Sequence, residues 1–187
     1  SMCYDFHAPF YPPYLTGYLS NLYPDPKQPK IKGYYRSSCL QSIQNLKNSA
    51  VPPDKILLGF PAYGIIYAGV KSTHEGMFQV FDPHLTPKLQ RGIKPKGYLQ
   101  YRFIEQLLTQ GFKEKQRYAH GKISAVWAYN AYTQQLTGYD NSVLVAEKAR
   151  WAKQQGLGGL MVWSINDDLN PQQKNSLLAT AAAKLKA

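Results

Sequence analysis

The chain has 187 residues, of which 22 are lysine or arginine and 11 are aspartate or glutamate, giving a formal net charge of +11. A hydrophobic fraction of 44% and an aromatic fraction of 13% are typical of a folded domain and exclude a disordered chain. The sequence contains no apolar run of about 18 residues, the length that predicts a membrane-spanning helix.

Cysteine, histidine and charge patterns argue against several classes of site. Cys3 and Cys39 are too few for a disulfide scaffold, and the four histidines are scattered as surface or loop residues, so we expect no metal site and no cofactor. The basic residues are spread along the chain without a nucleic-acid recognition motif. This spread favours a solubilising surface over a nucleic-acid site, and polyanion binding remains an alternative.

The first third of the chain predicts two strands and one helix. Residues 2–6 form a short apolar run, preceded by no basic and apolar leader, so we expect no secretion signal here and leave the localisation open. A proline-rich loop is expected over residues 8–36. A capping pattern, Ser38-x-x-Gln41, then predicts a helix that ends before Pro52-Pro53, and the continuous apolar run 56–60 predicts a strand buried on both faces.

The middle of the chain, residues 66–141, predicts a small α+β insertion. Short aromatic and β-branched stretches lie around 77–81 and 123–129. Between them an amphipathic helix is expected to carry Leu99 to Leu108 on one face and to end at Gly111.

The last part, residues 142–187, returns to alternating helix and strand. Ser142 or Asp140 is predicted to cap a helix that ends at Gly156, a buried strand follows over 159–165, and Asn170-Pro171 is predicted to begin the last helix. With segment 1–65, this order indicates an α/β fold with a parallel sheet. A (β/α)₈ barrel needs roughly 250 residues, so three core strands cannot close one alone.

Five phrases in chain order resemble the family 18 glycoside hydrolases, the chitinases. They are Met2–His7, similar to barrel strand six; Leu58–Gly64, similar to strand seven; Val126–Asn130 and Tyr139–Ser142, similar to the insertion of one chitinase subfamily; and Gly156–Ile165, similar to strand eight. The resemblance implies the C-terminal part of a (β/α)₈ TIM barrel, strands six to eight, with a small α+β insertion.

The family's Asp-x-x-Asp-x-Asp-x-Glu segment on strand four is not in these residues, and no Asp-x-Glu pair occurs. The resemblance implies a parent enzyme that hydrolyses β-1,4-linked N-acetylglucosamine polymers by substrate-assisted, retaining catalysis. Without the proton donor we expect the chain alone to be inactive, with no catalytic residue of its own. Expected partners are chitin or chitooligosaccharides, and either another copy or an N-terminal barrel fragment. A non-catalytic chitooligosaccharide-binding protein is the alternative.

The resemblance also implies substrate-binding residues. Trp163 would form the floor under a sugar ring, Tyr4 would orient the acetamide oxygen, and Asp5 would bind the same sugar. Taken without the family, the sequence around Trp163 favours a core residue, and the Tyr4–Asp5 pair favours a hydrogen-bonded strand end.

Two further positions complete the expected site. Tyr63 follows the second strand and has a structural alternative, and Trp127 has either a groove-wall or a core role. The family commonly has arginine where this chain has Ile65, so a charged contact to the sugar is missing. The adjacent acids Asp167 and Asp168 are predicted to belong to a loop and helix start.

Overall fold

A computed structural model of the whole chain describes residues 1–9, 12, 14–29, 38–85, 87, 93–94 and 97–186. Parts of the expected loop 8–36 and of the segment 86–96 lie outside these residues. The described α-helices are α1 (Cys39–Asn48), α2 (Ile104–Thr109), α3 (Ser142–Gln154) and α4 (Leu177–Lys186). The strands are β1 (Leu57–Pro61), β2 (Tyr63–Tyr67), β3 (Ile93–Lys94), β4 (Tyr98–Gln100), β5 (Lys113–Ala119), β6 (Lys122–Asn130), β7 (Gln135–Tyr139) and β8 (Gly159–Trp163). None of the described helices is long and apolar enough to cross a membrane.

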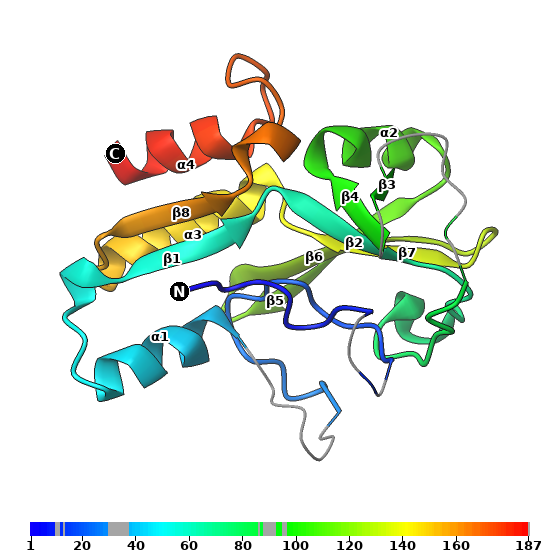
Figure 1. Cartoon of the computed structure of the whole chain (residues 1–187), viewed down its shortest axis with the longest axis horizontal. Helices are drawn as coiled ribbons and strands as arrows, with labels where there is room; N and C mark the ends of the chain where they lie inside the picture. Colours follow the sequence, from blue (N-terminus) through cyan, green and yellow to red (C-terminus); the bar gives the residue numbers. More distant parts are fainter. Residues whose placement is uncertain are drawn as a thin grey trace.

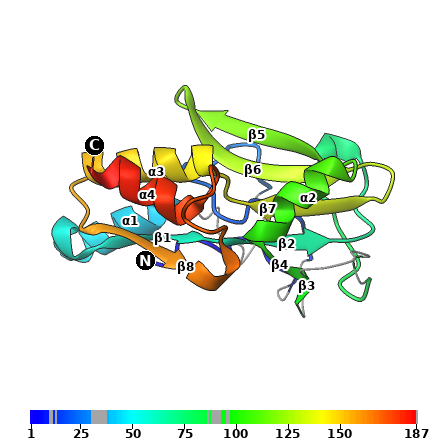
Figure 2. The same cartoon turned by 90° about the horizontal axis from the view of Figure 1, so that it is seen from above.

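Two sheets of different kinds lie side by side (Figure 1). β1 and β8 pair in parallel, with Leu57 opposite Gly159 and Pro61 opposite Trp163. The larger sheet is antiparallel, in the order β3-β4-β2-β7-β6-β5. Helices α3 and α4 cover one face of the β1–β8 pair (Figure 2). The α/β architecture with a parallel pair is therefore confirmed in outline.

The segment 2–6 is not a regular strand, contrary to expectation. Of residues 1–6, Ser1 makes the backbone bonds to β1. Its N-terminal ammonium donates to the Leu57 carbonyl at 2.7 Å, and its carbonyl accepts from the Gly59 amide at 2.8 Å. The extended path ends at Asp5, whose φ of 59° turns the backbone away. The segment still runs along the edge of β1 opposite β8.

Helix starts follow local capping chemistry, and one predicted cap is wrong. The Ser38 hydroxyl accepts from the Gln41 amide at 3.2 Å at the start of α1, as predicted. Asn141 caps α3 in place of Ser142 or Asp140, its side-chain oxygen accepting from the Leu144 amide at 2.9 Å.

The start predicted for the last helix is also wrong. Asn170 closes only a turn, its side chain accepting from the Gln172 amide at 3.1 Å. Helix α4 begins at Leu177, where the Asp168 carboxylate accepts from the amides of Leu177 and Leu178 at 3.1 and 2.8 Å. Asp168 is thus the helix-start acid that was expected.

Two elements of the predicted insertion also differ. The aromatic and β-branched stretch 77–81 makes one isolated bridge, Val80 to Leu15, and no regular strand. The helix expected from Leu99 is divided, since β4 and a 3₁₀ turn precede α2. The strand β2 crosses the boundary expected between residues 65 and 66.

His7 lies in a loop, as expected, but it is buried, with 1% of its surface exposed. Its ring lies 2.6 Å from the Gln28 side chain, and burial lowers its pKa to about 4. A Cβ on Gly17 would come within 2.3 Å of this ring, so glycine is required there.

Candidate functional site

A small pocket of about 290 Å³ opens where the two sheets meet. Four of the five site residues expected from the sequence line it, all except Trp127. The lining residues are Met2, Tyr4, Asp5, Tyr63, Ile65, Tyr98 and Trp163.

The pocket is assembled at strand ends. Tyr4 and Asp5 follow the segment bound to the edge of β1, Tyr63 begins β2 directly after β1, and Trp163 ends β8. Because β1 and β8 are parallel and in register, their carboxyl ends bring Pro61 and Trp163 opposite each other. Side chains from separate parts of the sequence therefore meet at one edge.

Tyr63 is the centre of the polar contacts. Its hydroxyl donates to the Asp5 carboxylate at 2.6 Å, and its ring packs edge-on to Tyr4 at 6.0 Å between centroids. Partial burial raises the pKa of Asp5 above its usual value, and the bond from Tyr63 opposes that shift. Of the residues that line the pocket, Asp5 is the single carboxylate.

Trp163 leaves its indole in solvent, with 57% of its surface exposed. The backbone of the same residue is fixed, because its carbonyl accepts from the Ala62 amide at 2.7 Å. An exposed indole on a fixed strand end is suited to stacking against the C–H face of a sugar.

The structure does not bring Trp127 to this group. Only 4% of its surface is exposed, it packs against Tyr18 at 5.9 Å, and its indole N–H donates to the Glu75 carbonyl at 3.1 Å. Trp127 lies inside the core of the larger sheet.

Tyr98 and Asp167 belong to the site and are missing from the sequence prediction. The ring of Tyr98 stacks on Tyr63 with 4.3 Å between centroids, and its hydroxyl donates to the Asp167 carboxylate at 2.5 Å. Gln100 and Ser164 also donate to Asp167, at 2.5 and 2.8 Å. Asp167 thus ties the larger sheet to the loop after β8 and holds the wall of the pocket. A helical interpretation of residues 99–108 concealed the strand that carries Tyr98.

Among the described residues, no group of three or more histidine, cysteine or acidic side chains could hold a metal ion. The pocket instead combines aromatic rings, tyrosine hydroxyls and one carboxyl. Such a set can bind a polar ring compound by stacking and hydrogen bonds.

Comparisons with known proteins agree with this arrangement. The family described as Glycosyl hydrolases family 18 matches residues 1–168. Oviduct-specific glycoprotein of Mesocricetus auratus is 27% identical over 167 residues, covering 89% of this chain and 22% of that protein. Chitinase B of Serratia marcescens is 30% identical over 141 residues, covering 67% of this chain and 27% of that protein.

The fold is shared with solved chitinases. A class V chitinase mutant from Nicotiana tobaccum, in complex with NAG4, superimposes with a TM-score of 0.78 at 24% identity. The match covers all of this chain and 48% of that one. The chain therefore spans about a quarter of these curated relatives and about half of the solved enzyme.

Proposed function

Because the chain belongs to glycosyl hydrolase family 18, we propose that it is the C-terminal portion of a chitinase-like barrel. In this proposal residues 1–65 supply strands six and seven, residues 66–141 form the insertion, and residues 142–187 supply strand eight and the last helix. The parallel pairing of β1 with β8, and the bonds from Ser1 to the other edge of β1, support three consecutive barrel strands.

We infer that the parent enzyme hydrolyses β-1,4-linked N-acetylglucosamine polymers. The observation that carries this proposal is the exposed Trp163 indole on the rim of the pocket that holds Tyr63 and Asp5. In substrate-assisted hydrolysis the 2-acetamido oxygen of the sugar attacks its own anomeric carbon while an acid protonates the leaving oxygen, with retention of configuration. That reaction needs an apolar floor, a group that aligns the acetamide oxygen and a carboxylate near the acetamide nitrogen.

The pocket supplies these three groups. Trp163 serves as the floor, the Tyr4 hydroxyl aligns the acetamide oxygen, and Asp5 accepts from the acetamide N–H. Tyr63, by donating to Asp5 at 2.6 Å, holds that carboxylate in place. Ile65 is buried where the family commonly has arginine, so recognition at this wall is apolar.

Replacing Trp163 by alanine is expected to weaken binding of N-acetylglucosamine tetramer roughly tenfold, the loss that corresponds to about 1.5 kcal/mol of buried aromatic surface. Isothermal titration calorimetry measures the effect. Ile165→Ala is the matched control, because Ile165 is exposed to the same extent, 57%, but does not line the pocket. An equal loss in both variants, or no loss in Trp163→Ala, contradicts the proposal.

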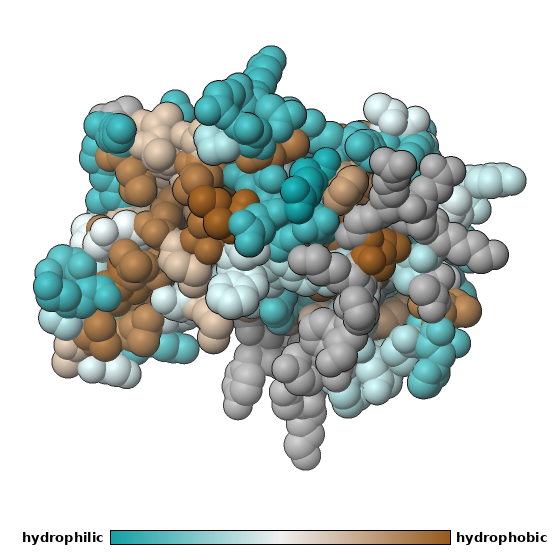
Figure 3. Space-filling model, turned by 45° about the horizontal axis from the view of Figure 1, so that its top comes forward, coloured by the Kyte–Doolittle hydropathy of each residue, from teal (hydrophilic) through white to brown (hydrophobic). Residues whose placement is uncertain are grey.

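We further propose that β8 is covered by a partner, either N-terminal barrel segments or a second copy. Among the described strands β8 pairs only with β1, which leaves its other edge open. Apolar side chains gather on the half of the molecule that holds β1, β8 and α4 (Figure 3). Leu57, Trp163 and Ile165 are 44%, 57% and 57% exposed there. Open edges and apolar patches favour association.

The chain alone is expected to have a solution mass above that of one copy, measured by light scattering. Leu57→Lys places a charge on the apolar half and is expected to shift the mass toward the monomer. Tyr132→Lys adds the same charge at a residue 97% exposed, on the turn between β6 and β7, and serves as the control. A monomeric wild-type chain, or an equal shift in both variants, argues against the covered edge.

A further inference from the structure

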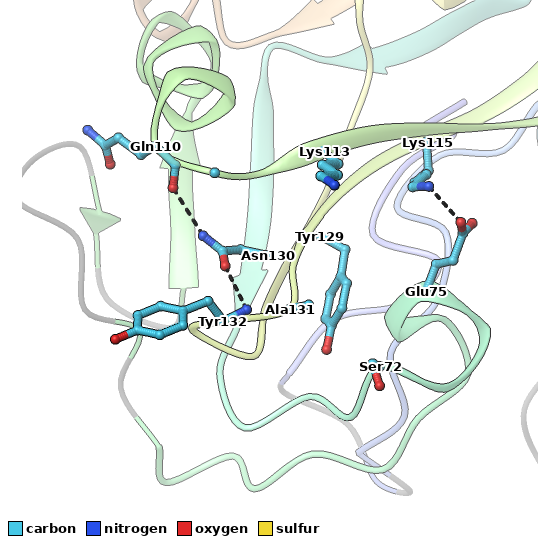
Figure 4. A pocket seen from close by; sticks show the side chains of 10 residues that line it. Ser72, Glu75, Gln110, Lys113, Lys115, Tyr129, Asn130, Ala131 and Tyr132 are labelled. Carbon is cyan, nitrogen blue, oxygen red and sulfur yellow. Dashed lines mark hydrogen bonds and ion pairs between the residues drawn. The ribbon is translucent and has the colours of Figure 1, made fainter.

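A second pocket, of about 510 Å³, lies in the part of the larger sheet remote from β8. It is formed by the 3₁₀ turn Thr73–Gly76, the end of α2, the start of β5 and the turn between β6 and β7 (Figure 4). None of its lining residues lines the pocket around Tyr63. Its volume is within the range of small-molecule sites.

The pocket carries an excess positive charge. Lys115 forms an ion pair with the Glu75 carboxylate at 2.6 Å. Lys113 lies two residues earlier on the same face of β5, and its side chain also lines the pocket (Figure 4). Within the described part of the chain, no carboxylate forms an ion pair with Lys113. An anionic group placed there would gain a charge-assisted hydrogen bond.

Aromatic rings form the apolar part of the pocket. Tyr129 is buried, its hydroxyl donating to the Val70 carbonyl at 2.8 Å, and Tyr132 is 97% exposed. The turn that carries Tyr132 is fixed by Asn130, whose side-chain oxygen accepts from the Tyr132 and Thr133 amides at 3.0 and 3.1 Å. Its side-chain amide donates to the Gln110 carbonyl at 3.1 Å. The exposed Tyr132 ring is therefore carried by a turn that hydrogen bonds fix in place.

Two glycines permit this close arrangement. A Cβ on Gly76, at φ +83°, would come within 2.7 Å of the Tyr129 ring. A Cβ on Gly111, at φ +84°, would come within 3.3 Å of the Asn130 amide nitrogen. Both positions favour glycine by conformation as well as by space.

We propose that this pocket binds an acidic saccharide unit, a sugar ring that bears a carboxylate. The ligand carboxylate binds the Lys113 ammonium, ring hydroxyls donate to the Glu75 carboxylate, and a C–H face of the ring packs on the exposed Tyr132 ring. A ligand that makes all three contacts must combine a ring, hydroxyl groups and an anionic group in one molecule. The site is independent of the proposed hydrolytic pocket.

Glucuronic acid is the probe, and the shifts of backbone amide signals in two-dimensional NMR are the readout. Glucuronate is expected to shift the amides of Gly111, Asn130 and Tyr132, with saturation in the millimolar range or tighter. Lys113→Gln is expected to weaken binding roughly tenfold, as for the loss of one charge-assisted bond. Tyr132→Ala is expected to weaken it as well, and glucose 6-sulfate separates a carboxylate preference from a general preference for anionic sugars.

Lys184→Gln is the matched control, since it removes the same charge from an exposed residue of α4. Glucose, which lacks the anion, and acetate, which lacks the ring, are both expected to bind more weakly than glucuronate. Lys113 is exposed, so the variant is expected to keep the wild-type spectrum outside the pocket. Absence of shifts at these amides, unchanged affinity in Lys113→Gln, or equal binding of glucose or acetate overturns the proposal.

Discussion

These 187 residues by themselves are expected to hydrolyse a fluorogenic chitotriose substrate at least about 10²–10⁴-fold more slowly than a complete family 18 chitinase, the range that general acid catalysis usually contributes. The sequence contains no Asp-x-Glu pair, and the pocket around Tyr63 has Asp5 as its single carboxylate. Asp5 already accepts from Tyr63, so it is poorly placed to protonate a leaving oxygen. Release of the fluorophore, followed in a fluorimeter, measures the rate.

A complete family 18 chitinase is the positive control. Asp5→Asn tests whether the remaining carboxylate supplies any residual rate, and we expect no further loss of turnover. Turnover by the isolated wild-type chain within tenfold of the complete enzyme would mean that the chain supplies its own general acid, and would contradict this prediction. Tetramer binding with Trp163→Ala tests the sugar site separately, so loss of catalysis and loss of recognition remain distinguishable.

Lys148→Met is expected to lower the free energy of unfolding by about 3–5 kcal/mol, as for one partner removed from a buried ion pair. The Lys148 ammonium lies 2.5 Å from the Asp140 carboxylate and 2.5 Å from the Ser20 hydroxyl, and neither charged side chain is more than 1% exposed. Burial raises the pKa of Asp140 to about 6, and the Lys148 charge opposes that rise. Removing the ammonium leaves a carboxylate in the core without its counterion. Urea unfolding followed by circular dichroism measures the change.

The matched control is Lys184→Met on the exposed face of α4, for which we expect a change within about 0.5 kcal/mol. The double variant Lys148→Met/Asp140→Leu removes both charges and is expected to recover much of the lost stability, because the desolvation penalty disappears with the pair. A loss below 1 kcal/mol in Lys148→Met, or a double variant as unstable as the single one, would contradict the prediction.

Capping residues, prolines and apolar runs in the sequence correctly predict the elements that depend on neighbouring residues. Ser38 and the proline pair around α1 act within a few residues, and the apolar runs of β1 and β8 are long enough to indicate strands. Residues 99–108 show where local signals fail. Their helical spacing is real, yet Tyr98 and Gln100 pair with β2 and bond to Asp167, and these distant contacts outweigh helix propensity.

The two tryptophans of the expected site show a second limit. Trp127 and Trp163 each lie in an apolar strand, so composition around them is similar. Trp127 lies on β6, which has a neighbouring strand on each side, and is buried, whereas Trp163 ends a strand with one neighbour and is largely exposed. Family resemblance identifies Trp163, while the number of neighbouring strands, which no local pattern encodes, decides the burial of both.

Ala62 connects the two sheets through the backbone. Its amide donates to the Trp163 carbonyl at 2.7 Å, and its carbonyl accepts from the Tyr101 amide at 3.2 Å. One residue therefore separates β1 from β2, so no flexible linker joins these two strands. A hinge at this point would have to break both bonds. These two bonds fix the spacing between the strand end that carries Trp163 and the strands that carry Tyr63 and Tyr98, so the proposed sugar site has a fixed width.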